Sequence, residues 1–298
     1  MHIAYCDHFV LPLPDGHRFP MSKYARLRQR VSRERLGTLF VPDAADDRAL
    51  RSVHTPEWVA AVATGALPPA AIRRVGFPWS PGLVERSRRS VGGTLAAARH
   101  ALRDGVAVSL AGGTHHAFPD HGEGFCVFND VAVAVRSLQG SGALRRVAVI
   151  DLDVHQGNGT AAIFHDDPDV FTLSVHGARN YPFAKETSDL DLALPDGTDD
   201  EPYLRAVDEG LEAALAHAPQ LVFYVAGADA FAGDRLGRLS VSKRGLAARD
   251  RRVFERCLHA GVPVAVVMAG GYAARVEDSV DIHAATVREA AGAWRRCT

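Results

Sequence analysis

Lysine is scarce in this chain: Lys23, Lys185 and Lys243 stand against 31 arginines in 298 residues. A large charge of one sign is also missing, because the formal net charge is only −1 and the arginines are spread over several expected helices. The sequence therefore has no basic run of the kind that contacts nucleic acid, and we predict no direct nucleic-acid binding. Scarce lysine beside abundant alanine and arginine is typical of a GC-rich bacterial genome.

Cysteine is sparse as well, and the four that occur, Cys6, Cys126, Cys257 and Cys297, form no CxxC pair. A disulfide framework or a thiolate zinc site is therefore not expected, and buried free thiols are. Long hydrophobic runs are missing too, because the longest late one, residues 262–269, is too short to span a bilayer. The N-terminal segment has no signal-peptide core, so we predict a cytoplasmic protein without membrane association.

The composition is that of a globular protein, with 47% hydrophobic and 23% charged residues. The proline-rich stretches at residues 68–69 and 78–81 are short and flanked by apolar residues, so they suit surface connections better than a flexible linker. We therefore predict a single domain over residues 1–298.

From residue 106 onward, short valine-rich runs alternate with longer amphipathic stretches, which is the pattern of βαβ units around a buried parallel sheet. The expected strands are 106–110, 147–150, 170–174, 221–226 and 263–268. Helices are expected over 128–138, 202–217, 243–259 and 278–294. Earlier helices are expected over 23–36 with Ser22 as cap, after Thr55 with Pro56 in first position, and over 81–103. The predicted fold class is α/β, an open, mostly parallel sheet flanked by helices.

Histidine, aspartate or tyrosine follows each of the five expected strands. The segments, in chain order, are Gly112-Gly113-Thr114-His115-His116, Asp151-Leu152-Asp153-Val154-His155, Ser174-Val175-His176, Gly227-Ala228-Asp229 and Gly270-Gly271-Tyr272. Parallel strands end at the same carboxyl edge, which is where open α/β sheets bind their ligands. We therefore predict that these side chains meet in one crevice.

Asp153 and His155 are suited to hold one metal ion together. Residues two apart face the same side of an extended segment, and Asp229 from another strand would complete a set of three ligands. Oxygen and imidazole ligands with an open fourth position suit catalytic zinc (Zn2+), and the same ligands tolerate ferrous iron (Fe2+). Asp151, one step earlier on that face, is better placed behind the ligands than among them.

Each of these residues has a simpler interpretation when taken alone. A single Asp or His near a strand end is usually a cap or a hydrogen-bonded surface group, and the glycine pair before Tyr272 could be only a turn. Together they favour catalysis, because adjacent His115 and His116 beside a metal supply a general base and a general acid. The hydroxyl of Tyr272 could stabilise an oxyanion. His176 has no evident partner, and we interpret it as structural.

Five motifs follow one another along the chain. They are Gly112-Gly113-Thr114-His115-His116-Ala117, Gly124-Phe125-Cys126, Asp151-Leu152-Asp153-Val154-His155, Gly227-Ala228-Asp229 and Gly270-Gly271-Tyr272. In sequence and in order they resemble the zinc-dependent histone deacetylase family, from about residue 15 to residue 285. The segment 16–21 (Gly-His-Arg-Phe-Pro-Met) and the Gln156 after His155 look most like the class IV branch and its bacterial relatives.

The resemblance implies the arginase/deacetylase fold and gives a role to most of these residues. The implied metal ligands are Asp153, His155 and Asp229. The implied catalytic residues are His115 with Asp151 behind it, His116 with Asn158 behind it, and Tyr272. The residues implied to line an acyl-lysine tunnel are Phe125, Tyr181, Leu236, Gly124 and Gly270. A structural potassium ion (K+) is implied near Asp151 and Ser174, and Arg18 is implied at an internal channel below the metal. Asn158 stands where some members have aspartate, so the two histidines are expected to differ in charge preference.

The predicted activity is hydrolysis of an acyl-amine amide, with a lysine side chain carrying an acetyl or longer acyl group as substrate. The predicted partner is an acylated lysine of a protein or peptide, or else a small acylated amine such as an acetylated polyamine. A two-metal ureohydrolase is disfavoured, because Gln156 and Gly157 follow His155 where further ligands would be needed. A non-catalytic acyl-amine-binding module would not need Tyr272 or the tandem histidines. Acyl-chain length and oligomeric state are left open by the sequence.

Overall fold

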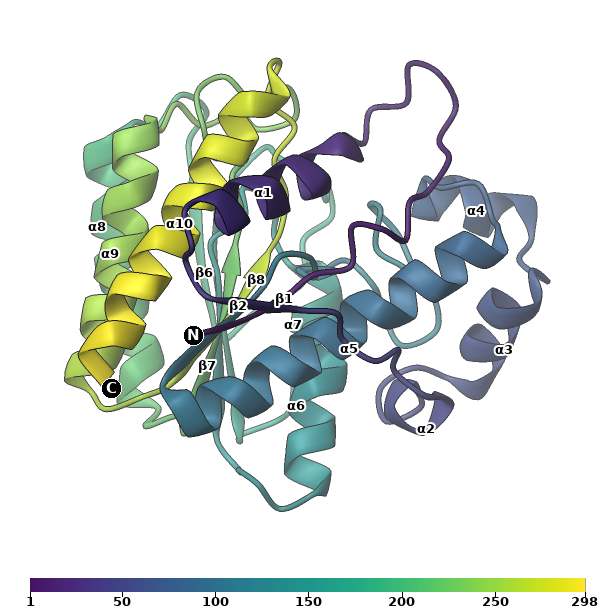
Figure 1. Cartoon of the computed structure of the whole chain (residues 1–298), viewed down its shortest axis with the longest axis horizontal. Helices are drawn as coiled ribbons and strands as arrows, with labels where there is room; N and C mark the ends of the chain where they lie inside the picture. Colours follow the sequence, from purple (N-terminus) through teal and green to yellow (C-terminus); the bar gives the residue numbers. More distant parts are fainter. Residues whose placement is uncertain (298) are drawn as a thin grey trace.

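The computed structural model describes residues 1–297, and within them one open sheet of eight parallel strands lies at the centre (Figure 1). The strands are β1 His2–Ala4, β2 Thr38–Phe40, β3 Val106–Ser109, β4 Val147–Asp151, β5 Val170–Gly177, β6 Leu190–Leu194, β7 Leu221–Ala226 and β8 Val264–Met268. Their order across the sheet is β2-β1-β3-β8-β7-β4-β5-β6, and each neighbouring pair is parallel. The predicted open, mostly parallel sheet is confirmed.

Three strands were not predicted from the sequence: β1, β2 and β6. β1 and β2 have three residues each, and β2 and β6 form the two edges of the sheet. The residues of β6 are partly or fully exposed. A short edge strand meets water along one side and needs few apolar residues, so it leaves a weak hydrophobic signal in the sequence.

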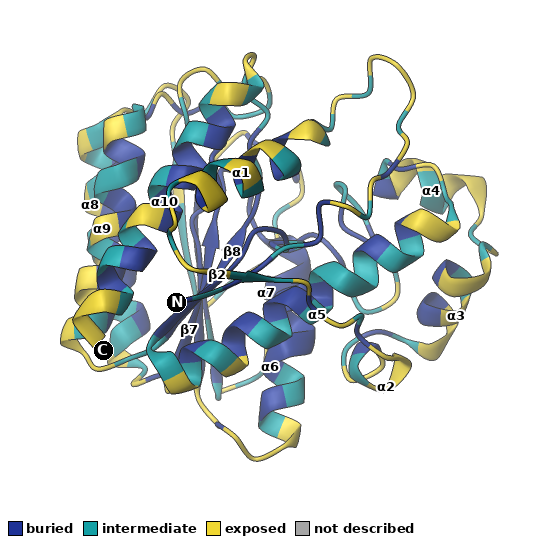
Figure 2. Ribbon diagram, in the orientation of Figure 1, coloured by how far each residue is buried: buried dark blue, intermediate teal, exposed yellow. Residues whose placement is uncertain are grey.

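Successive side chains of the central strands alternate between two helical layers, as the period of an extended strand requires. In β4, Ala148 and Ile150 join one core and Val147 and Val149 join the other. The first core packs against α1 Ser22–Arg33, α8 Asp200–Ala216, α9 Lys243–His259 and α10 Val276–Cys297; the second packs against α5 Pro81–Asp104, α6 Asp130–Gly140 and α7 Asn158–Phe164. Figure 2 shows the buried strands between helices whose outer faces are exposed.

A third apolar cluster lies at the N-terminal half of α5, to one side of the sheet (Figure 1). It includes residues of α2 Asp47–Leu50, α3 Pro56–Thr64 and α4 Pro69–Val75. The end of α4 is tied to a loop that precedes α6, because Gly124 N donates to Arg74 O at 3.2 Å and Phe125 N donates to Val75 O at 2.8 Å. That these parts form a single domain stays a prediction.

The predicted helices are present, with ends shifted by a few residues. Thr55 caps α3 as predicted, since its hydroxyl accepts a backbone hydrogen bond from the first turn. The prediction that Ser22 caps α1 is wrong. Ser22 is the first helical residue and Met21 occupies the N-cap position without a side-chain hydrogen bond, while Lys23 N donates to Pro20 O at 3.0 Å. None of the helices in residues 1–297 is long and apolar enough to cross a membrane.

Candidate active site

Four neighbouring strands carry the predicted site at their carboxyl ends. In sheet order they are β3, β8, β7 and β4, and the loops that follow them contain His115, Tyr272, Asp229 and Asp153 respectively. His115, Tyr272 and Asp153 line a cavity of about 790 Å³, and Asp229 is fully buried next to Asp153. A cavity of this volume is in the usual range for small-molecule sites. The crevice predicted at this edge of the sheet is therefore present for four of the five strands. The prediction fails for the fifth, because Ser174 and His176 are buried within β5 and are not among the described lining residues of the cavity.

Asp153, His155 and Asp229 bring their ligand atoms together on the inner wall of this cavity. One candidate ligand atom from each residue lies within 4.8 Å of the others, and all three residues are buried. Nδ1 of His155 is 2.9 Å from Oδ1 of Asp153 and 3.2 Å from Oδ2 of Asp229. The structure thus unites the three residues that the sequence predicts as metal ligands.

The chemistry of these three side chains fits a bound cation. Burial and the Asp153 carboxylate raise the pKa of Asp229 to about 7, because two buried negative charges repel each other. Oδ2 of Asp229 has no hydrogen-bond partner among residues 1–297, since the nearby Nδ1 of His155 bonds to Asp153 instead. An unpartnered buried carboxylate oxygen is unfavourable unless a positive group binds it. Two carboxylates and an imidazole also form a donor set that zinc accepts.

Two glycines leave room for these ligands. A Cβ atom at Gly270 would lie 1.8 Å from Oδ2 of Asp229 and 2.6 Å from Oδ2 of Asp153. A Cβ atom at Gly227 would lie 2.7 Å from the same Asp153 oxygen. Gly270 N also donates to Oδ2 of Asp153 at 2.7 Å. Any side chain at Gly270 would therefore displace a candidate ligand.

A buried arginine holds the backbone that carries the ligands. Arg249 on α9 is fully buried, and its Nη1 donates to the carbonyl oxygens of Gly227 at 2.6 Å and Leu152 at 3.3 Å. Asp250 lies 2.8 Å from its Nη2 and balances the charge. The two carbonyls belong to the segments that contain the candidate ligands. The sequence gives no signal for this role, because Arg249 is one of several arginines on an amphipathic helix.

The adjacent histidines have different partners and different charge preferences. Nδ1 of His115 donates to Oδ2 of Asp151 at 2.6 Å; burial lowers the pKa of His115, but the Asp151 carboxylate outweighs burial and raises this pKa to about 9. Nδ1 of His116 donates to Oδ1 of Asn158 at 2.7 Å, and burial together with His115 and His155 lowers the pKa of His116 well below its usual value. These pKa shifts favour a charged His115 and a neutral His116 near pH 7.

A carboxylate that the sequence analysis missed lies behind Asn158. Nδ2 of Asn158 donates to Oε1 of Glu123 at 2.7 Å, so His116, Asn158 and Glu123 form a chain of hydrogen bonds. Burial and Glu123 also raise the pKa of Tyr181, which keeps that hydroxyl protonated. The only sequence signal for Glu123 is its position just before Gly124.

Tyr272 lines the same cavity, and its hydroxyl stays protonated at neutral pH. Burial and the Asp153 and Asp229 carboxylates raise the pKa of Tyr272 well above its usual value. Its backbone N–H donates to Oδ2 of Asp234 at 2.6 Å, while Oδ1 of Asp234 accepts from the backbone N–H groups of residues 236 and 237. Asp234, which the sequence analysis also missed, thereby ties Tyr272 to the loop after β7. The structure presents the Tyr272 hydroxyl as a hydrogen-bond donor.

The predicted tunnel residues all lie on the wall of this cavity. They are Gly124, Phe125, Tyr181, Leu236 and Gly270. Phe125 has a φ of 67°, which is uncommon for a residue with a side chain. Its ring centroid is 6.0 Å from that of Tyr272, and the ring of Tyr181 lies 5.0 Å from that of His116. Their contact with a substrate stays a prediction.

Arg18 does not lie at an internal channel, so that prediction is wrong. Arg18 is exposed at the mouth of the cavity, because the segment that carries it runs over the surface before α1 (Figure 1). Among the cationic residues that line the cavity, Lys23 is the buried one in the described part of the chain, at only 2% exposure. Nζ of Lys23 donates to Ala269 O at 3.1 Å and lies 5.3 Å from the ring centroid of Tyr272.

Ser174 and His176 are buried in β5 next to the strand that carries Asp151. Ser174 is the register partner of Asp151, and its Oγ lies 3.0 Å from Nδ1 of His176. Burial lowers the pKa of His176 to about 4, which leaves the imidazole neutral and suits a structural role. A potassium ion near Asp151 and Ser174 stays a prediction.

Known proteins are similar to this chain in sequence and in fold. The histone deacetylase domain matches residues 17–287. The chain is 47% identical over 292 residues to an uncharacterised protein of Picosynechococcus sp., with 97% of each covered. It is 33% identical over 259 residues to the histone deacetylase-like amidohydrolase of Pseudomonas aeruginosa, with 80% of this chain and 67% of that protein covered. A crystal structure of an HDAC homolog complexed with SAHA has the same fold, with a TM-score of 0.84 at 24% identity over 98% of this chain and 83% of that one. The chain belongs to the histone deacetylase family.

Proposed function

We propose that this protein is a metal-dependent amidohydrolase that removes an acetyl or longer acyl group from the side chain of an acyl-lysine. One observation carries the proposal: the buried set of Asp153, His155 and Asp229, with its unpartnered carboxylate oxygen, adjoins a cavity that also exposes a pair of unlike histidines. Membership of a family of deacetylating hydrolases supports the same reaction.

Asp153, His155 and Asp229 would hold one zinc ion, and ferrous iron is an acceptable substitute for the same donor atoms. Bound there, the metal would act as a Lewis acid that polarises the amide carbonyl and makes a water molecule nucleophilic near pH 7. The backbone N–H groups of Val154 and Gly270 orient the carboxylates, donating to Asp229 at 2.9 Å and to Asp153 at 2.7 Å. A structural potassium ion behind this site remains part of the proposal.

His116 is the proposed general base. Its low pKa keeps the imidazole neutral, so its free nitrogen can take a proton from the attacking water, while Asn158 fixes the other nitrogen. His115 is already charged through Asp151 and contributes positive charge beside the reacting amide. The proton that His116 accepts then passes to the leaving amine, which would otherwise depart as a very unstable anion.

Tyr272 is the proposed donor to the oxyanion. Its raised pKa keeps the proton on the hydroxyl, and a protonated hydroxyl can donate a hydrogen bond to a carbonyl oxygen as that oxygen gains negative charge. Phe125 and Tyr181, with Leu236, would flank the aliphatic part of the acyl-lysine. A cytoplasmic location also stays a proposal, which the four free cysteines favour.

A substrate screen tests this proposal. Purified protein is incubated with lysine peptides carrying acyl chains of increasing length and with acetylated polyamines, and the released acid is measured. We expect hydrolysis of at least one acyl-lysine peptide by the wild type and none by Asp229→Ala. Absence of hydrolysis of every amide, or equal rates in the two proteins, would contradict the assignment.

A further inference from the structure

The lining of the active-site cavity is strongly cationic. The chain as a whole is balanced, with 34 lysines and arginines against 35 aspartates and glutamates. Among the residues that line the cavity, positive side chains outnumber negative ones. The cationic lining residues are Arg18, Lys23, Arg73, Arg74, Arg179, Arg235 and Arg238, whereas Asp153 is the one carboxylate among the described lining residues. Folding has therefore collected positive charge at one place on a nearly neutral protein.

The arginines of this set form a rim around the mouth, and each is exposed. Arg18 precedes α1, and Arg73 and Arg74 lie in the last turn of α4. Arg179 follows β5, and the last two, Arg235 and Arg238, lie in the loop after β7. The rim thus comes from four separate segments of the chain and not from a single loop or helix.

Few ion pairs offset this rim, although Asp120 lies within electrostatic range of Arg74. Within residues 1–297, Arg238 is the one rim arginine with an ion pair, to Asp196 at 3.3 Å, and that pair is exposed on the arginine side. The carboxylate of Asp153 is committed to the candidate metal site. A cleft lined by charge of one sign concentrates ligands of the opposite sign and speeds their association by roughly 10- to 1,000-fold.

We propose, building on the deacylase function above, that the substrate is an acyl-lysine within an acidic polypeptide segment. The neutral acyl-lysine side chain would enter the cavity, and flanking carboxylates would contact rim arginines on several sides of the mouth. An extended chain fits a rim drawn from four segments better than a single small anion does. Phe183, which is 85% exposed and also lines the mouth, offers an apolar contact to a residue beside the acyl-lysine.

The same rim disfavours cationic substrates. A polyamine keeps positive charge after acetylation of one end, and a basic histone-like tail carries several positive charges next to each lysine. Both would meet like charge at the mouth, and such juxtaposition is an efficient means of rejecting the wrong partner. The positive rim therefore favours an acyl-lysine in an acidic segment over an acetylated polyamine or a basic tail, although all three present the same amide.

Three peptides that share one central acyl-lysine test this proposal, with flanking residues that are all aspartate, all alanine or all arginine. We expect kcat/KM for the acidic peptide to exceed that for the basic peptide by at least about tenfold at about 50 mM salt, mainly through KM. The ratio should fall toward one at about 500 mM salt, because salt screens exposed charges. Equal kcat/KM values at low salt would overturn the proposal while leaving the deacylase function intact.

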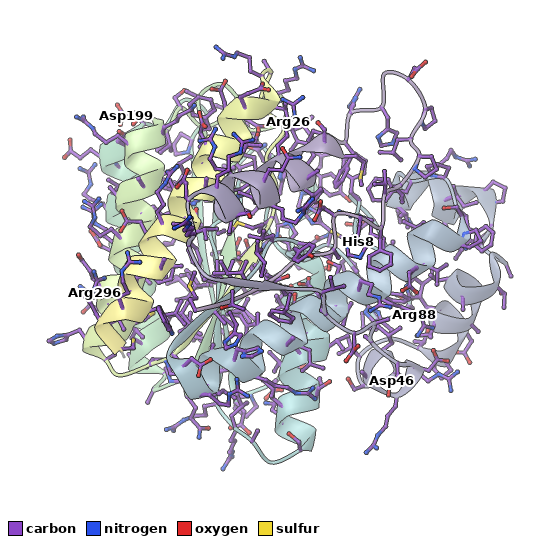
Figure 3. All side chains as sticks on the ribbon, viewed as in Figure 1. His8, Arg26, Asp46, Arg88, Asp199 and Arg296 are labelled. Carbon is purple, nitrogen blue, oxygen red and sulfur yellow. The ribbon has the colours of Figure 1, made fainter. Side chains whose placement is uncertain are left out.

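Charge-reversal variants test whether the rim arginines cause the preference for the acidic peptide. In Arg73→Glu/Arg74→Glu the acidic-to-basic ratio of kcat/KM should drop severalfold or invert. The matched control is Arg99→Glu/Arg296→Glu, which changes net charge equally. Arg99 is exposed on the second half of α5, and Arg296 lies near the far end of α10, about 30 Å along that helix from its start near Tyr272 (Figure 3). An equal change in both variants would show a general charge effect and contradict a specific rim.

A binding measurement separates this proposal from the proposed reaction. Fluorescently labelled versions of the three peptides are titrated with wild-type protein, and anisotropy gives each Kd at low and high salt. If no peptide is hydrolysed, the deacylase function fails, and tighter binding of the acidic peptide still supports the rim. Hydrolysis with indistinguishable Kd values supports the function and refutes the rim.

Discussion

Replacement of Gly270 by alanine tests whether the proposed metal ligands need the space that this glycine leaves open. The new Cβ would lie 1.8 Å from Oδ2 of Asp229, whereas real Cβ contacts are essentially never shorter than 3.0 Å. The carboxylate or the backbone must therefore move by about 1.2 Å. Displacement of a reacting group by about 1 Å can lower a rate about 100-fold, which corresponds to about 2.7 kcal/mol. Gly270 is not among the positive-φ glycines, so the effect of alanine is steric.

We expect Gly270→Ala to lower kcat/KM on an acyl-lysine peptide about 100-fold and to weaken zinc affinity by about 10- to 100-fold. Zinc affinity is measured by competition with a chromophoric chelator, and thermal unfolding checks that the variant is folded. Gly140→Ala is the matched control, because a Cβ atom at Gly140 meets nothing within 4 Å. Wild-type zinc affinity and turnover in folded Gly270→Ala would refute the placement of the metal beside Asp229 and Asp153.

Five further variants test the roles proposed for the side chains around this site. Tyr272→Phe should retain metal and substrate binding but lose about 100- to 1,000-fold in kcat, and a loss of only a few fold would remove its hydroxyl from the mechanism. His116→Ala should lower kcat more than His115→Ala does. A larger loss in His115→Ala would make His115, and not His116, the general base. Asn158→Asp should raise the pKa of His116 and move the acidic limb of the kcat/KM profile to higher pH. The new carboxylate would face the Glu123 carboxylate, and repulsion between the two would disfavour its charged form. The shift should therefore be larger in the double variant with Glu123→Gln, and an unmoved limb in both variants would contradict the assignment.

The sheet and the cluster of candidate metal ligands were predictable because their signals are local. The alternation of valine-rich runs marks the strands, and Asp153 and His155 closely follow the end of one of them. Residues 153–155 form a bend and not the extended segment expected from the two-residue step, and His155 N donates to Oδ1 of Asp153 at 3.0 Å within it. The order of strands then brings Asp229 alongside, as expected for carboxyl ends of a parallel sheet. The edge strands β2 and β6 escaped prediction because they bury too little apolar surface to show a pattern.

The supporting contacts were not predictable because they join distant positions. Glu123 meets Asn158 across 35 residues, and Arg249 meets Leu152 O across 97. Neither side chain differs in sequence context from an ordinary surface residue. The arginine rim is a similar case: along the sequence the arginines are dispersed, and only the fold brings Arg18 and Arg238 to one opening.

Metal titration of chelator-treated protein tests the central claim most directly. The protein is stripped of metal, and zinc is added in steps while bound metal per chain and the rate of acyl-lysine hydrolysis are measured together. The proposed site at Asp153, His155 and Asp229 predicts negligible turnover without metal and full turnover at one zinc per chain, with ferrous iron also restoring activity. Undiminished hydrolysis by the metal-free protein, or a requirement for two tightly bound ions per chain, would contradict it.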